Sequence, residues 1–390
     1  MNHLKHISLS ILLCAILFSV SGCTKNREEQ SESIQYINNM ESLTDTIMFH
    51  TSNGLQRTNL EQGQSIFVCN QSSCVHSTED CFAIKYQLSN YPLEYGEKLF
   101  FIRKFYNDTE FVTCEKDGSN MEILNKWDGA YEMGNNAVRV GENLYYFAKK
   151  NQVGMTEAGY VYVKNSKAAL YETNIRTGKT KNLYEIEDSY GTECSNLLYS
   201  NGKLFCLYVR QNKSIEDAGY SPEEYFEALN DNEFIMRMEE LFDIRTNLVV
   251  VDLEKEQSFV SKDEMIYQLN GVWNGEAIIT YKNKRDFYNY DYENNTNSVW
   301  HENDGSMIMT QLSEGILLSY FDMQTFEKTN YLYTGDWDAL KKLQNNKNLN
   351  MSVILEAKDT IYVSWEPRSM SSSEEQWEYS VERKEFLFGK

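Results

Sequence analysis

A repeated pattern of a turn residue followed by a short apolar strand most strongly limits what this chain can fold into. Each copy continues into a segment such as EKLFFI or ENLYYF. The copies begin at Gly96, Gly141, Gly202, Gly275 and Gly315, and a related strand without the glycine, KDTIYVSW, begins at Lys358. The starts lie 45, 61, 73, 40 and about 43 residues apart. A period of about 40 to 50 residues is typical of β-propeller blades.

Polar turns and further strands follow these segments. Asp117-Gly118 and Thr177-Gly178 are hairpin signals, and an earlier unit spans Thr46 to Leu60 with Asn53-Gly54 at its turn. A small meander of this kind cannot cover both of its faces alone, so the units must stack in a ring. We therefore expect an all-β fold, a β-propeller of about seven blades (six or eight are possible) over residues 43–390. Two packed sheets with coincidental spacing are the alternative.

The amino-acid composition agrees with many paired strands. The chain has 27 tyrosines and only 3 prolines among 390 residues. Aromatic and β-branched residues favour strands, whereas proline interrupts the hydrogen bonds between paired strands. The composition therefore favours an all-β protein.

One of the enlarged spacings contains a helical insertion, which we expect at residues 221–242. Ser221 is a good N-cap, Pro222 suits the first helical turn, and Glu224 completes a capping box. The apolar face is interrupted at residues 230–232. A second, shorter helix is expected at residues 336–343. Such insertions cover a face or rim of a propeller or provide a recognition surface.

The N-terminus has the pattern of an export signal. Lys5 precedes an apolar run from Ile7 to Val20, which is too short to span a membrane comfortably. The sequence Val20-Ser21-Gly22-Cys23 resembles the bacterial lipobox, which implies that residues 1–22 are removed and that Cys23 receives a lipid. The alternative is an ordinary cleaved signal. Residues 23–42 are polar and are expected to form a tether to the outer face of the membrane.

The net charge argues against nucleic acid as a partner. The chain carries 37 basic and 58 acidic residues, a formal charge of −21. Such a surface repels DNA, RNA and anionic lipid head groups. The lipid on Cys23 would then be the attachment to the membrane.

A dense group of cysteines occurs in CNQSSCVHSTEDC, residues 69–81. Cys69, Cys74, His76 and Cys81 offer three thiolates and one imidazole, the four donors that a closed tetrahedral Zn²⁺ site requires. Disulfide formation is the alternative, because exported cysteines often oxidise. Both interpretations remain open from the sequence. We expect the remaining Cys114, Cys194 and Cys206 to pack as small apolar groups.

The lipobox, the cysteine loop and the strands around it carry a resemblance to a protein family. A strand ending in FVC, whose cysteine is Cys69, followed by Cys74, His76 and Cys81, resembles a group of uncharacterised lipoproteins of Gram-positive bacteria. The folded part of that group is similar to the β-propeller of low-density lipoprotein receptor-related proteins. The YWTD-type motif of the receptors is replaced here by LFFI and LYYF. The resemblance implies a location and a fold, and it assigns no reaction.

Known catalytic signatures are missing from the sequence. It has no G-x-S-x-G, Walker, H-E-x-x-H or G-x-G-x-x-G motif, and only His50, His76 and His301 follow Cys23. We therefore name no catalytic residue and expect a non-catalytic lipoprotein that binds a protein, peptide or glycan outside the membrane. The alternative is an extracellular hydrolase that acts on polysaccharide in the propeller channel.

Overall fold

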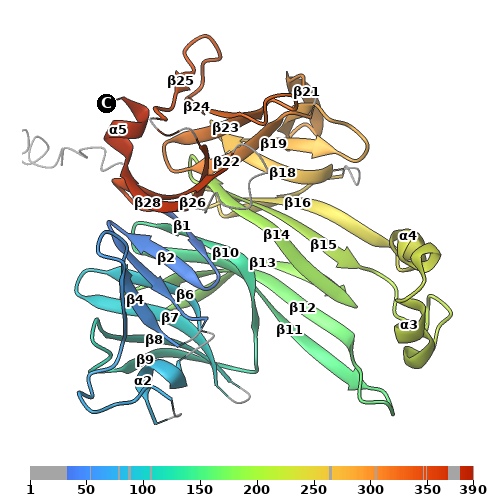
Figure 1. Cartoon of the computed structure of the whole chain (residues 1–390). Coiled ribbons are helices and arrows are strands. Elements are labelled where there is room, and N and C mark those ends of the chain that lie inside the picture. Colours follow the sequence, from blue (N-terminus) through green and yellow to red (C-terminus); the bar gives the residue numbers. More distant parts are fainter. Residues whose placement is uncertain are drawn as a thin grey trace, which may run out of the picture. The chain divides into compact units, whose positions relative to one another are not determined.

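Seven antiparallel β-sheets form the folded part of the chain (Figure 1). The computed structural model describes residues 33–389, except for 53, 78–79, 87–88, 106–107, 263–265, 304, 346, 348 and 368–377. The sheets follow one another in chain order, with one exception at the N-terminus. The expected β-propeller of seven blades is confirmed.

Each blade is built from three or four consecutive strands. Blade 1 comprises β2 (Glu41–Thr44), β3 (Ile47–His50), β4 (Gln56–Asn59) and β5 (Gln64–Phe67). Blade 2 comprises β6 (Asn90–Tyr95), β7 (Lys98–Phe105), β8 (Asp108–Glu115) and β9 (Glu122–Asp128). Blade 3 comprises β10 (Glu132–Val140), β11 (Asn143–Met155), β12 (Val161–Asn174) and β13 (Thr180–Ser189). Blade 4 comprises β14 (Gly191–Ser200), β15 (Lys203–Gln211), β16 (Ile244–Asp252) and β17 (Gln257–Val260).

The remaining three blades complete the ring. Blade 5 comprises β18 (Ile266–Trp273), β19 (Glu276–Tyr281), β20 (Phe287–Asp291) and β21 (Thr296–His301). Blade 6 comprises β22 (Met307–Leu312), β23 (Gly315–Phe321), β24 (Lys328–Tyr333) and β25 (Lys341–Lys342). Blade 7 comprises β26 (Asn350–Glu356), β27 (Thr360–Glu366) and β28 (Glu378–Arg383), and α5 (Lys384–Phe388) follows it. Contacts of β26 with both β24 and β2 place blade 7 between blades 6 and 1.

One strand lies outside this chain order. The first strand of the chain, β1 (Ile34–Asn38), pairs with β10 of blade 3, with Ile34 opposite Val140 and Asn38 opposite Asn136. It also contacts β2, β6 and β26, the first strands of three other blades. The strand that precedes blade 1 is therefore an additional inner strand of the ring.

The apolar core is divided among the seams between neighbouring blades. Within blade 4, Phe205 and Leu207 of β15 pack toward blade 5, whereas Leu204, Cys206 and Tyr208 pack toward blade 3. This alternation follows from the strand geometry, in which successive side chains point to opposite faces of a sheet. The second strands of blades 2 to 7 each contain a run that is buried on both faces, which explains the nearly continuous apolar sequence of that run.

The turn glycines identified in the sequence connect the first and second strands of several blades. Asn201 (φ +49°) and Gly202 (φ +72°) form the two-residue connection between β14 and β15. Both residues need positive φ in this kind of hairpin, and asparagine followed by glycine accepts that conformation at low cost. The repeated glycine is therefore a hairpin signal inside these blades.

The expected helical insertion is confirmed as two helices between β15 and β16. Ser221 Oγ accepts a hydrogen bond from the Glu224 N–H, and the Glu224 carboxylate accepts one from the Ser221 N–H, so the capping box starts α3 (Pro222–Ala228). Asp231 caps α4 (Asn232–Leu241). Figure 1 shows both helices beyond the ends of β15 and β16. The two helices and the segments beside them form a small apolar core, whose buried residues are Ile215, Phe234 and Phe242.

Two expectations from the sequence differ from the structure. Residues 336–343 form a turn and the short strand β25 instead of a second helix, since Lys341 and Lys342 pair with Leu332 and Tyr331. The fold also begins before residue 43, because β1 and the start of β2 lie in the segment expected as a tether.

Residues 1–32, including the expected signal and Cys23, lie outside the described part of the chain. Among the residues that the structure describes, no helix has the length and apolar character needed to cross a membrane.

Candidate metal centre and central cavity

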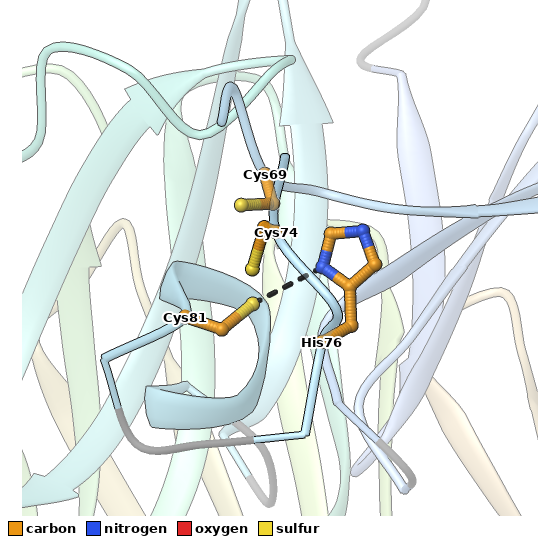
Figure 2. Close-up of side chains that lie close together, drawn as sticks. All are labelled: Cys69, Cys74, His76 and Cys81. Atoms are coloured by element: carbon orange, nitrogen blue, oxygen red, sulfur yellow. Dashed lines mark hydrogen bonds between the residues drawn. The ribbon is translucent and has the colours of Figure 1, made fainter. Parts of the chain in front are cut away.

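Three cysteines and one histidine converge in the connection between blades 1 and 2. Cys69, Cys74 and His76 lie in the loop after β5, and Cys81 immediately precedes α2 (Phe82–Lys85). The four ligand atoms all lie within 4.8 Å of one another, and His76 Nδ1 is 3.2 Å from Cys81 Sγ. Figure 2 shows the four side chains pointing toward one another. The structure thus brings together the four residues that the sequence grouped.

The local backbone orients the histidine toward the cysteines. His76 has φ +51°, a left-handed backbone conformation within the loop. Its ring stacks on Phe67 with 4.6 Å between the centroids and 26° between the planes. This stacking presents Nδ1 to the sulfur atoms.

The connection that carries the cluster packs against blade 2. Val68 and Tyr86 are buried beside Leu99 and Phe101 of β7. A Cβ atom on Gly118, in the turn between β8 and β9, would lie only 2.9 Å from Phe82 and 3.0 Å from the Val68 carbonyl oxygen. The two ends of the connection are therefore closely packed, whereas the loop between them has little apolar core of its own.

Two of the thiols have pKa values shifted in opposite directions. A hydrogen bond from the backbone of His76 lowers the pKa of the Cys74 thiol. Burial raises the pKa of the Cys81 thiol, and the Ile84 amide partly opposes that rise. Cys81 is 1% exposed, whereas Cys69 and Cys74 are half-buried. A bound cation would favour the thiolate form of all three cysteines, since the thiolate is the ligand.

The donor set and its spacing fit a tetrahedral zinc ion. With Zn–S distances of about 2.3 Å and a Zn–N distance of about 2.1 Å, the ligand atoms of a tetrahedral site lie about 3.4–3.8 Å apart. The observed limit of 4.8 Å requires side-chain adjustments of only about 1 Å to reach that geometry. Four protein ligands would leave no open position on the metal, which is typical of a structural site.

The cysteines outside the cluster lie in the apolar seams, as expected. Cys114, Cys194 and Cys206 are at most 2% exposed, and burial raises the pKa of Cys114 to about 12. All six described cysteines are free thiols in this structure. The choice between metal and disulfide at residues 69–81 therefore depends on the metal and thiol content of the protein.

A second candidate site is a cavity of about 360 Å³ at the inner strands of the ring. It is lined by residues of β1, β10, β14, β18, β22 and β26. Amide side chains are the most numerous polar groups, and they are Asn38, Asn135, Asn136, Asn196, Gln268, Asn270 and Gln311. The cavity has the size of common small-molecule sites, which occupy about 300–1,000 Å³.

Some of these amides hold adjacent blades together. Asn136 Nδ2 donates to the Leu197 carbonyl (2.7 Å), and its Oδ1 accepts from the Leu197 N–H (3.1 Å). Asn196 Nδ2 donates to the Leu269 carbonyl (3.1 Å), and Gln311 Oε1 accepts from the Val272 N–H (2.9 Å). Each contact joins the first strand of one blade to the first strand of the next. These amides have a structural role at the wall of the cavity.

Other amides remain available to a ligand. Asn38, Asn135 and Gln268 are exposed at the cavity, and their side chains have no hydrogen-bond partner within the described part of the chain. They lie on β1, β10 and β18. Three separate strands therefore present free amides to one space.

The one charged residue among the described lining residues is held by protein groups. Glu356 accepts a hydrogen bond from Lys384 Nζ (2.6 Å), and both side chains are buried. Its two carboxylate oxygens also accept from the Ser313 N–H (3.1 and 2.9 Å). The carboxylate thus links blades 6 and 7 with α5.

Sequence reasoning missed the lining of the cavity. Its residues lie on β1 and on the first strands of blades, whereas the recognisable repeat marks second strands. The acidic segment Asp286–Asn295 contains β20 and the turn after it, in which Asp291 Oδ1 accepts from the N–H groups of Glu293 and Asn294. His50 bonds Thr58, and His301 stacks on Trp337 at 4.3 Å.

Comparisons with known proteins find only distant structural similarity. No protein-family model and no curated protein matches the chain. Dipeptidyl peptidase 4 of Porphyromonas gingivalis is similar at 11% identity and a TM-score of 0.42, over 90% of this chain and 49% of that one. A chain of a nidogen/laminin complex is similar at 10% identity and a TM-score of 0.32, over 68% and 80%. Oligogalacturonate lyase in complex with manganese is similar at 11% identity and a TM-score of 0.40, over 74% and 73%.

Proposed function

We propose that this chain is a lipid-anchored, non-catalytic binding protein whose central cavity takes up a neutral glycan outside the membrane. The observation that carries the proposal is the set of free amides, Asn38, Asn135 and Gln268, around one cavity. Each amide can donate and accept hydrogen bonds, which matches the donor and acceptor character of sugar hydroxyls. Partly exposed apolar lining residues such as Met309 and Val353 can contact the C–H faces of a sugar ring.

The charge of the lining favours an uncharged ligand. Glu356 is the described lining residue with a charge, and its carboxylate already has Lys384 and Ser313 as partners. A charged ligand would lose hydration at this wall without gaining an unpaired opposite charge. A neutral polysaccharide meets the chemistry of the site better than an acidic or basic peptide.

The proposal is tested by measuring whether a chain that starts at residue 24 binds neutral polysaccharides. The variant Gln268→Leu should weaken binding by about two- to tenfold, the value of one hydrogen bond. Gln152→Leu, which removes an exposed amide of β11 that does not line the cavity, is the matched control. If the protein bound an uncharged peptide and none of the glycans tested, the choice of a glycan as the ligand would be contradicted. Release of new reducing ends would support a hydrolase instead.

For the cluster of Cys69, Cys74, His76 and Cys81 we propose a structural zinc ion. The support is the donor set and the spacing of the ligand atoms within 4.8 Å. The ion would fasten the loop that connects blades 1 and 2. Protein purified under reducing conditions should contain about one equivalent of zinc, as metal analysis would measure. Protein prepared without a reductant that lacks zinc and has a mass lower by two hydrogens per cysteine pair would establish the disulfide alternative.

The proposed location rests on the sequence of the N-terminus. The lipobox-like Val20-Ser21-Gly22-Cys23 supports cleavage before Cys23 and attachment of a lipid to its sulfur. Cys23→Ser should release the protein from the membrane fraction and remove the acyl mass from the mature N-terminus. An unchanged membrane fraction would contradict the anchor.

A further inference from the structure

A small aromatic pocket between blades 2 and 3 is independent of the central cavity. Its volume is about 50 Å³. Four of its six lining residues are aromatic, and the lining comprises Trp127, Tyr131, Met133, Tyr146, Ala148 and Tyr171. These residues come from β9, the turn after it, β10, β11 and β12. Neither the proposed glycan site nor the metal cluster involves any of them.

The rings form a corner with walls in two orientations. Tyr131 and Tyr171 are nearly perpendicular, with 87° between their planes and 6.3 Å between their centroids. Tyr146 lies nearly parallel to Tyr171, at 23° and 5.7 Å. A group inside such a corner can contact ring faces from more than one side.

Hydrogen bonds hold the walls in place. Thr109, which is buried, donates to the Gly129 carbonyl (2.9 Å) and accepts from the Tyr131 N–H (2.8 Å). Tyr146 Oη is 3.0 Å from Thr173 Oγ1. Burial raises the pKa of Tyr171 to about 12, so its phenol is neutral at physiological pH. The pocket is therefore preorganised and its lining is uncharged.

The electrostatics of this pocket favour a cation. The faces of Trp and Tyr rings carry negative potential and attract quaternary ammonium groups, each ring contributing about 0.5–2 kcal/mol. Lys150 Nζ already lies over the Tyr131 ring, 6.0 Å from its centroid. The chain as a whole carries a charge of −21, which attracts cationic ligands. One water molecule needs about 10–15 Å³ of such cavity volume, so 50 Å³ has room for about three to five waters, comparable to the four heavy atoms of a trimethylammonium group.

We propose that this pocket binds a trimethylammonium group, as in choline or betaine, against Trp127, Tyr131 and Tyr171. The binding needs no change in covalent structure. The aromatic pocket would be a second binding site, separate from the proposed glycan site, and neither proposal depends on the other.

A comparison of choline with its uncharged isostere, 3,3-dimethyl-1-butanol, tests the proposal on the unaltered full chain in a nonionic detergent. Calorimetric titration should show choline bound at least about tenfold more tightly, because only choline supplies the cation. Equal binding of the two compounds would mean a merely apolar pocket and would overturn the proposal. Failure to detect binding at choline concentrations up to about 10 mM would also overturn the proposal.

Substitutions locate the site and separate binding from folding. Tyr131→Leu should weaken choline binding by about tenfold, whereas Tyr131→Phe keeps the ring and should change it less than about twofold. Lys150→Gln removes a neighbouring positive charge and should strengthen binding by about two- to fivefold at low salt. Each variant is compared with the unaltered chain by circular dichroism. Folded Tyr131→Leu protein with unchanged affinity for choline would overturn the assignment.

Discussion

At the scale of single residues, His76 distinguishes a metal site from a simple cysteine clasp. A disulfide needs only two thiols, whereas a four-coordinate zinc ion here needs the imidazole as its fourth ligand. Nδ1 of His76 faces the sulfur atoms, and the Phe67 ring holds that orientation. Removal of this one side chain therefore gives different results under the two interpretations.

We predict that His76→Ala lowers zinc affinity by at least about tenfold, since loss of a direct ligand should cost no less than loss of a group that orients one. Competition with a chromogenic chelator measures the change. His76→Asn should lower the zinc affinity to a similar extent. Asparagine tolerates the left-handed conformation at φ +51°, so this variant separates loss of the ligand from backbone strain. His50→Ala is the control, because His50 bonds Thr58 outside the cluster. Unaltered affinity in both His76 variants would refute the ligand role.

A second residue-scale prediction concerns the buried ion pair of Lys384 and Glu356. The two side chains are 4% and 6% exposed and 2.6 Å apart. Lys384→Met leaves a buried carboxylate without its cation, which should lower the free energy of unfolding by about 3–5 kcal/mol. The double variant Lys384→Met/Glu356→Leu should recover part of that loss, as urea unfolding would show. If the Lys384→Met protein were as stable as the double variant or more stable, this account would be contradicted.

The predictability of the two sites from sequence follows from the way their residues are distributed along the chain. The cluster lies within thirteen residues, and soft donors are rare elsewhere, so Cys69, Cys74, His76 and Cys81 could be grouped by spacing alone. The cavity is different. Its free amides lie on three strands separated by about a hundred residues or more, and an isolated Asn or Gln has no distinctive pattern. Only the closure of the ring brings them together.

At the scale of elements, β1 is the strand whose position the sequence did not indicate. Its five residues lie in a polar segment, and its partner β10 begins almost a hundred residues later. The second strands of blades 2 to 7 were found easily because burial on both faces gives each of them an apolar run. In β1, Ile37 is fully buried whereas Asn38 is exposed, which gives too short an alternation to recognise.

We predict that β1 is required for full stability of the propeller. Ile37 packs with Tyr91 and Ala137 in the seam between blades 2 and 3, and Gln35 Nε2 donates to the Leu43 carbonyl (2.9 Å). A chain that starts at Asn39 loses these contacts and the whole ladder with β10. It should melt at a clearly lower temperature than a chain that starts at Ser33, since loss of the Ile37 side chain alone is worth about 2–5 kcal/mol. Equal melting temperatures would show that β1 is dispensable.

At the scale of the whole molecule, ring closure depends on side-chain packing between blades 7 and 1. Among the strands that the structure describes, blade 1 consists of N-terminal strands and blade 7 of C-terminal strands, and none of these sheets shares strands from both ends of the chain. The buried core of this seam consists of Leu43, Leu355 and Ala357. The seam between blades 3 and 4 buries many more residues, including Phe147 and Tyr208. Thr360 Oγ1 donates to the Asp45 carbonyl across the closure.

This difference in packing predicts where the ring opens first. Local opening costs least free energy where the fewest apolar contacts are lost. Native-state hydrogen exchange should therefore be faster in β2, β3, β26 and β27 than in β14, β15 and β16. Leu43→Ala should accelerate exchange in the first group while leaving the second nearly unchanged, because it enlarges the weakest seam. Leu204→Ala, in the seam between blades 3 and 4, is the matched substitution. Exchange at one common rate in all seven blades, before and after Leu43→Ala, would mean that the ring unfolds as a single unit and that its closure is no weaker than its other seams.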